Sequence, residues 1–197
     1  QNNTSRRVLF KESEYAGDDW VNDFEGRFPE DNEDYTNLKR MTDWVVSCIG
    51  NPTKFRNEFE QYFHKDFMLS YYVITELFAM VDQRAKNCFW TTFDTKIWLP
   101  IFYDNDTALG INNEGVNAFY FDVETHDKLG TKDVWNGADS ELWKLLEQAF
   151  PSELEAMYQR IRKDDTLSYN SVLNVLNGEH SDKWAETVYN EDGLFKY

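Results

Sequence analysis

The stretch Lys65–Val81, KDFMLSYYVITELFAMV, is followed closely by two aromatic runs, Cys88–Phe93 (CFWTTF) and Lys96–Tyr103 (KIWLPIFY). The first stretch is apolar on almost every side at helical spacing, which predicts a central, buried helix. The two runs are rich in β-branched and aromatic residues and are joined by Asp94-Thr95, so they predict a β-hairpin. These three segments decide the fold, because a buried helix beside a hairpin fixes how the rest of the chain must pack.

Two consequences follow for the core and for the flanking segments. Because the central helix must be enclosed, we expect three of its large neighbours to be buried: Leu77, Phe78 and Trp98. Helical patterns over residues 34–48 and 53–63 precede it, separated by Gly50-Asn51-Pro52, where proline suits a first helical position. Further helical patterns cover 140–150, 152–162, 168–176 and 182–189, and short strands are expected at 7–11 and 118–121. The fold class is therefore α+β and mostly helical, and 197 residues fit a single domain.

Charge and composition exclude several classes of partner. The net charge is −16, from 36 acidic and 20 basic residues, and such a surface repels nucleic acid and anionic membranes. No run of eighteen apolar residues is present, which excludes a membrane-spanning helix. The two cysteines, Cys48 and Cys88, are expected to be free thiols in a reducing compartment. A phosphate-bearing ligand would need a metal ion or local positive charge, which Arg84 and Lys86 are expected to supply.

One group of polar residues surrounds the predicted hairpin. Asp82 ends the buried helix, Asn87 follows five residues later, and Asp104 and Asp106 leave the second strand. Carboxylate and amide oxygens are the ligands that Mg²⁺ prefers, and phosphoryl transfer combines such ligands with a carboxylate that orients the acceptor. The spacing predicts one magnesium site containing Asp82, Asn87 and Asp104, with Asp106 adjacent. The carboxylates of Asp82 and Asp104 should then lie within about 12 Å of each other.

Other interpretations of these residues stay open at this point. Asp-x₄-Asn spacing is common by chance, and Asp104-Asn105-Asp106 is also typical of an ordinary turn stabilised by Asx side chains. Glu76, inside the buried helix, either has a functional role or satisfies a buried polar contact. The three histidines lack the mutual spacing that a metal site requires: His64, His126 and His180.

Four runs of sequence together resemble the CotH (spore-coat protein H) kinase-like family: Tyr62–Phe67, Thr75–Asp82, Asn87–Trp90 and Trp98–Gly110. That family has a buried helix, an Asn that opens a strand, and a turn of the form Trp-Asp-x-Asp that ends in Gly. Here Tyr103 replaces the usual Trp. The resemblance implies an atypical protein-kinase-like C-terminal lobe with a small β-hairpin, which uses ATP and Mg²⁺ to phosphorylate protein serines.

The resemblance also implies a role for each residue of the group. Asp82 would be the catalytic carboxylate, Asn87 and Asp104 would bind the cofactor, and Asn87, Asp104 and Asp106 would be metal ligands. The family's nucleotide-binding lysine is expected upstream of residue 1. Lys11 is interpreted as an ordinary charged residue at the end of a strand and not as that lysine. Residues 1–197 are therefore interpreted as the C-lobe portion of a CotH-kinase-like domain from a longer chain, and alone they are expected not to transfer phosphate.

The segment Asp104–Gly115, DNDTALGINNEG, is most similar to versions of the family in large structural and tail-associated proteins of bacteriophages. This implies a tail-associated or minor structural virion protein, assembled in the bacterial cytoplasm. Its partners would be other virion proteins or the rest of its own chain. The alternative is an active Mg²⁺-dependent protein serine kinase domain with a protein substrate. Neither nucleic acid nor a membrane is an expected partner.

Overall fold

The structure is a computed structural model that describes residues 24, 26, 34–80, 83–84, 87–105, 108–109 and 140–177. The predicted strands at 7–11 and 118–121, the predicted helix at 182–189, and residues Asp82, Lys86, Asp106 and His126 lie outside this part of the chain. The chain divides into two compact units, Gln1–Leu154 and Glu155–Tyr197. The single domain over residues 1–197 stays a prediction.

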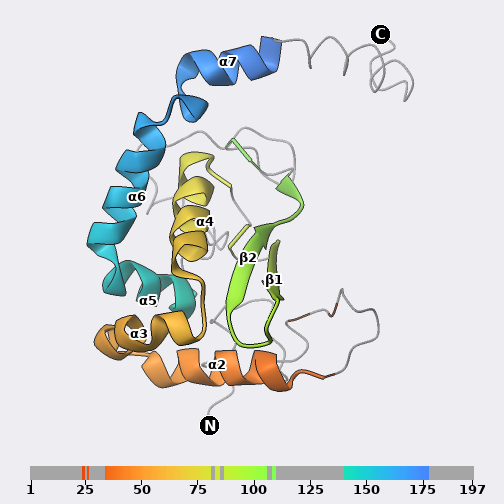
Figure 1. Cartoon of the computed structure of the whole chain (residues 1–197), viewed down its shortest axis with the longest axis vertical. Coiled ribbons are helices and arrows are strands. Elements are labelled where there is room, and N and C mark those ends of the chain that lie inside the picture. Colours follow the sequence, from red (N-terminus) through yellow and green to blue (C-terminus); the bar gives the residue numbers. More distant parts are fainter. Residues whose placement is uncertain are drawn as a thin grey trace, which may run out of the picture. The chain divides into compact units, whose positions relative to one another are not determined.

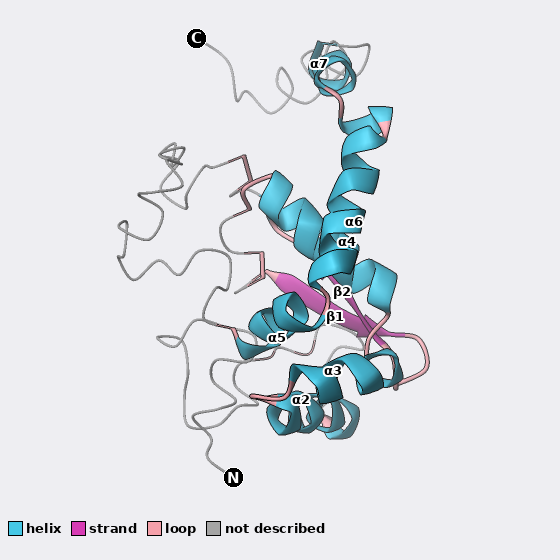
Figure 2. Cartoon of the chain, turned by 90° about the vertical axis from the view of Figure 1, so that its left-hand side faces the viewer, coloured by secondary structure: helices cyan, strands magenta, loops and turns pink. Residues whose placement is uncertain are grey.

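The described elements confirm a mostly helical fold with one small hairpin (Figure 1). In chain order they are α2 (Thr36–Cys48), α3 (Pro52–Glu58), the 3-10 turn η3 (Phe59–Gln61), α4 (Lys65–Leu77), β1 (Cys88–Thr92), β2 (Trp98–Phe102), α5 (Glu141–Ala149), α6 (Pro151–Lys163), the 3-10 turn η6 (Asp165–Leu167) and α7 (Tyr169–Asn177). β1 and β2 pair antiparallel, with Cys88 opposite Phe102 and Thr92 opposite Trp98 (Figure 2). No helix of the described part is long and apolar enough to cross a membrane.

The turn from β1 to β2 is organised by Asp94. One of its carboxylate oxygens accepts hydrogen bonds from the backbone N–H groups of Lys96 and Ile97, both at 2.8 Å. These bonds to the ionised form lower the pKa of the Asp94 carboxyl. Thr95 takes a left-handed conformation with φ = +64°, which turns the chain back on itself. The expected Asp94-Thr95 junction is therefore where the hairpin reverses.

The junction between α2 and α3 follows its sequence signals. Pro52 occupies the start of α3, and the Asn51 side chain accepts a hydrogen bond of 3.0 Å from the Lys54 backbone N–H. Gly50 has φ = +76°, a left-handed conformation that costs glycine little and ends the preceding helix. The predicted helix over 53–63 is instead α3 followed by η3. Its last residues leave the helix because Phe63 bridges to Trp98 of the hairpin.

Strand β2 and the residues after it are hydrogen-bonded to the chain on both sides of α4. At the start of the helix, the Trp98 N–H donates to the Tyr62 carbonyl (2.8 Å) and the Trp98 carbonyl accepts from the His64 N–H (3.0 Å). At the other end, Gln83, a few residues past the helix, donates to the Asp104 carbonyl. The segment from Trp98 to Asp104 is therefore attached to the chain both before and after α4.

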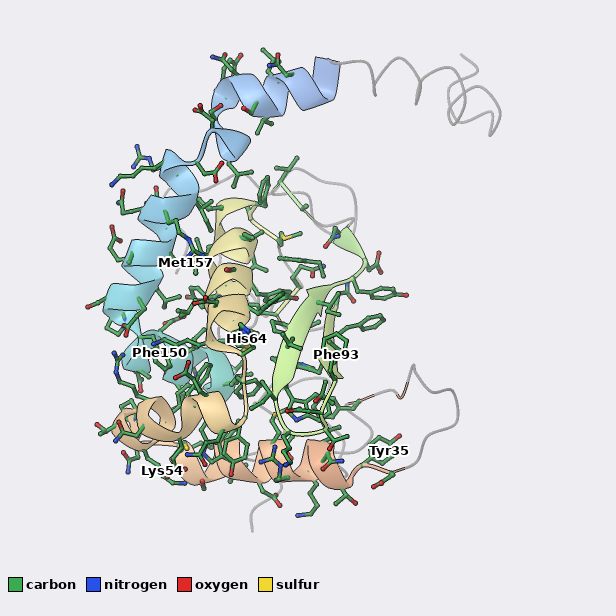
Figure 3. All side chains as sticks on the ribbon, viewed as in Figure 1. Tyr35, Lys54, His64, Phe93, Phe150 and Met157 are labelled. Atoms are coloured by element: carbon green, nitrogen blue, oxygen red, sulfur yellow. The ribbon has the colours of Figure 1, made fainter. Side chains whose placement is uncertain are left out.

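Aromatic rings connect these elements through the core. A continuous series of ring contacts, with centroids 4.5–6.0 Å apart, runs through Trp44, Phe55, Phe59, Phe63, Trp90, Trp143, Tyr71 and Phe102. Phe150, labelled in Figure 3, closes the edge where α5 meets α3, with its ring 4.9 Å from that of Phe59. Offset and tilted pairs of this kind are favourable beyond the apolar area that they bury. The series therefore ties α2, α3, α4, α5 and the hairpin into one core.

Helix α4 differs from its prediction in two ways. It ends at Leu77 rather than near Val81, and it is not buried on every side, because Leu77 is 42% exposed and Phe67 is 54% exposed. The expected burial is confirmed for Trp98, is wrong for Leu77, and is only partial for Phe78. The face that carries Met68, Leu69, Tyr71, Val73 and Thr75 is the buried one. The helix is thus amphipathic, although its sequence is apolar on both sides.

The end of α4 is a Schellman motif built without glycine. The Ala79 N–H donates to the Glu76 carbonyl (3.1 Å), and the Met80 N–H donates to the Thr75 carbonyl (2.9 Å). Ala79 has φ = +46°, a left-handed conformation that is unfavourable for a residue with a Cβ. The Phe78 carbonyl then accepts from the Leu109 N–H at 2.6 Å, which brings the segment after β2 to this helix end.

We expect Ala79→Gly to raise the free energy of unfolding by about 1 kcal/mol, because glycine removes the Cβ penalty of the left-handed conformation. The matched control is Ala149→Gly in α5, which should lower the free energy of unfolding by about 1 kcal/mol, because that residue is helical. Urea denaturation followed by circular dichroism measures both. Destabilisation by Ala79→Gly would show that α4 does not end in this motif.

Candidate functional site

Two of the predicted ligands come together at the end of the hairpin. Asn87 directly precedes β1 and Asp104 follows shortly after β2, so antiparallel pairing places them side by side. The Asn87 side-chain N–H donates to the Asp104 backbone carbonyl at 3.4 Å. Asp82 and Asp106 lie outside the described residues, so their distances from this pair stay predictions.

Asp104 holds an unusual backbone conformation at this place. Its φ is +53°, in the left-handed region that Asp and Asn enter more readily than other residues with a Cβ. The residue is exposed. Its carbonyl accepts from the Asn87 amide and also from the side-chain amide of Gln83, at 3.1 Å. The chain therefore turns sharply at Asp104, and two side chains from the preceding loop hold that turn.

Gln83 is a residue of this site that the sequence did not reveal. It is completely buried, and besides Asp104 its amide N–H group donates to the Tyr103 carbonyl at 2.6 Å. The Tyr71 hydroxyl lies 3.2 Å from both the side-chain oxygen and the backbone carbonyl of Gln83, and it can donate to either. A glutamine in a polar loop carries no pattern that marks it as buried, so no signal in the sequence could have identified it.

Arg84 is buried, contrary to the sequence-based expectation. The sequence suggested that it supplies positive charge to a phosphate ligand, but it is only 4% exposed. Its guanidinium forms an ion pair with Glu76 and lies over the Tyr72 ring, 4.1 Å from the centroid. Its carbonyl accepts a hydrogen bond of 3.0 Å from the Trp143 indole N–H. The Arg84 guanidinium is thus paired with the Glu76 carboxylate within the protein.

Two further titratable groups near the site are held in their neutral forms. Burial raises the pKa of the Tyr72 hydroxyl far above its ordinary value, and this hydroxyl donates to Glu147 at 2.5 Å. Burial also raises the pKa of the Cys88 thiol to about 12. The shift disfavours the thiolate, which is the reactive and metal-binding form. Both cysteines are free, as expected.

The donor set fits a hard divalent cation. Asn87 and Asp104 offer an amide oxygen and a carboxylate, which suit Mg²⁺. Among the residues that the structure describes, no three His, Cys, Asp or Glu side chains gather in a way that could hold a metal. Of the four residues expected at the site, the structure describes Asn87 and Asp104, and Asp104 is the only carboxylate of these two. The residues present fit such an ion, and a complete site would need the two that lie outside the described ranges.

Comparison with known proteins gives one match. Residues 10–175 match the family model described as CotH kinase protein. The matched range includes all four residues of the predicted site and both strands of the hairpin. No curated protein and no solved structure matches the sequence.

The burial of Arg84 leads to a prediction about stability. Arg84→Met keeps an unbranched side chain against the Tyr72 ring but removes the guanidinium, so the free energy of unfolding should fall by about 2 kcal/mol. The control is Arg56→Met: Arg56 is 45% exposed and pairs with Glu153, so its loss should lower the free energy of unfolding less than Arg84→Met does. Chemical denaturation compares the two variants. A loss from Arg84→Met no greater than that from Arg56→Met would contradict the assignment of Arg84 as a buried anchor.

Proposed function

This chain belongs to the CotH kinase family, and we propose that it carries a site for ATP and Mg²⁺ where the ends of α4 and β2 meet. The observation that supports this proposal is the contact between Asn87 and Asp104. Two residues with oxygen ligands, seventeen positions apart in the chain, lie together at the place where the sequence predicts a cation.

The charge of the chain is consistent with a cation at this place. A net charge of −16 opposes the approach of a nucleotide triphosphate, and Arg84 does not offset it because its guanidinium is already paired with Glu76. A bound Mg²⁺ would neutralise phosphate charge and orient the phosphoryl group. Asp104 and Asn87 would hold that ion, with Asp106 as a further ligand.

The remaining role belongs to Asp82. Phosphoryl transfer to a protein serine needs a carboxylate that accepts the proton of the attacking hydroxyl and aligns its oxygen. Asp82 has the Asp-x₄-Asn spacing to Asn87 that is found in protein-kinase catalytic loops, and it stands directly before the buried Gln83. The proposed activity is therefore an atypical protein kinase that uses serine hydroxyl groups as acceptors.

A structural role in a bacteriophage particle is the second proposal. It rests on the resemblance, described in the sequence analysis, of the segment Asp104–Gly115 to versions of the family in phage structural and tail-associated proteins. In that setting the protein would be a virion component assembled in the bacterial cytoplasm, in contact with other virion proteins or the rest of its own chain. The two proposals are compatible, because a virion component can retain a nucleotide site.

The nucleotide site is tested by thermal shift of the full-length protein with millimolar ATP and Mg²⁺. We expect the melting temperature to rise by several degrees, because a ligand that binds only the native state stabilises it by mass action. The rise should disappear with EDTA and in Asp104→Asn. Asparagine is chosen because it tolerates the left-handed backbone of Asp104 while removing the charge.

The matched control is Asp94→Asn, at the opposite end of the same hairpin, where an exposed aspartate is neutralised by the same change. Each variant is compared with its own melting temperature without ligand. Asp94→Asn should retain the nucleotide shift. No shift in the wild-type protein would refute the nucleotide site and leave the structural role as the remaining proposal.

A further inference from the structure

The Gln83 side chain uses both of its N–H donors, and its oxygen lies beside a hydroxyl donor. Its N–H group donates to two successive carbonyls, those of Tyr103 (2.6 Å) and Asp104 (3.1 Å), and its oxygen lies 3.2 Å from the Tyr71 hydroxyl. A buried amide with these partners avoids the penalty of an unpaired polar group. The arrangement is also specific, since an apolar side chain of this size would supply neither the two N–H donors nor the acceptor.

Packed aromatic rings lie behind Gln83. The Tyr71 ring stacks on Phe102 at 4.5 Å and lies 5.9 Å from Trp143. Trp143 in turn donates its indole N–H to the carbonyl of Arg84, the residue after Gln83. The loop at residues 83–84 is therefore fixed from both sides by aromatic residues of α4 and α5.

These contacts converge on the backbone of Asp104. Its left-handed conformation costs free energy relative to an extended one, and the surrounding structure has to compensate. The Asp104 carbonyl accepts from both Gln83 and Asn87, which its two lone pairs allow. One donor to this carbonyl, Gln83, follows the proposed catalytic residue Asp82 in the sequence. The other donor, Asn87, is itself a proposed metal ligand.

We propose that Gln83 is a positioning residue for the candidate metal site, which holds the Asp104 backbone in the conformation that presents its carboxylate to the ion. The proposal rests on the proposed function. Groups that orient metal ligands typically change metal affinity by 10- to 100-fold when they are lost. Gln83→Met, which keeps the volume and removes all three hydrogen bonds, should therefore weaken divalent-cation binding about tenfold or more.

The experiment titrates the full-length protein with Mn²⁺ and measures the free ion by EPR spectroscopy, at a temperature where every variant is folded. Binding at this site is the part of the occupancy that Asp104→Asn removes, which separates it from ions held loosely by the acidic surface. Gln83→Met should show about tenfold weaker binding at the site. Tyr71→Phe keeps the ring on Phe102 but removes the hydroxyl, so it should weaken Mn²⁺ binding to a smaller extent. This variant replaces Gln83→Met in the test if Gln83→Met does not fold.

A purely structural role is tested with Thr42→Val in α2. The Thr42 side chain is buried and its hydroxyl donates to the Lys39 carbonyl at 3.0 Å, so the variant should lower the melting temperature without changing Mn²⁺ affinity. Wild-type affinity in both Gln83→Met and Tyr71→Phe would overturn the positioning role and leave the metal site standing. Absence of Asp104-dependent Mn²⁺ binding in the wild-type protein would overturn the proposed function and the positioning role together.

Discussion

The rest of the structure depends on one constraint: strand β2 is hydrogen-bonded to the segments on both sides of helix α4. Trp98 is joined to Tyr62 and His64 before the helix, and Asp104 is joined to Gln83 after it. Because these bonds lie before and after α4, the strand cannot shift along the helix without breaking bonds at one end or the other. The place where Asn87 meets Asp104 is therefore a consequence of how the hairpin is attached, and the candidate site inherits its geometry from the fold.

The aromatic core packs against the residues that make this attachment. Its series of rings ends at Tyr71 and Phe102, close to Gln83, and Trp143 holds the loop at Arg84. The residues proposed to meet a ligand stand at the edge of this core, where Asp104 is exposed. A rigid interior with exposed polar ends is the arrangement that a preorganised binding site needs, since ligands held in place in advance lose little freedom on binding.

Periodicity and residue type could predict most of the helices in the described part of the chain, the hairpin, and the contact of Asn87 with Asp104, because these follow from local pattern and from antiparallel pairing. The end of α4 could not be predicted, since Ala79 adopts a left-handed conformation that sequence rules assign to glycine. The burial of Gln83 and Arg84 could not be predicted either. Both are polar residues in a loop, and their burial is decided by Tyr71, Tyr72 and Trp143, which approach from other elements. Contacts between distant residues overrode the local expectation that polar loop residues face water.

The proposed metal site is tested most directly by a crystal structure of the full-length protein grown with Mn²⁺, with data collected at a wavelength where manganese scatters anomalously. We expect an anomalous peak bound by the side-chain oxygens of Asp104 and Asn87, at the roughly 2.1 Å typical of small divalent cations with oxygen ligands. A well-ordered structure with manganese bound elsewhere, or with Asp104 and Asn87 facing away from each other and from any ion, would contradict the proposed site.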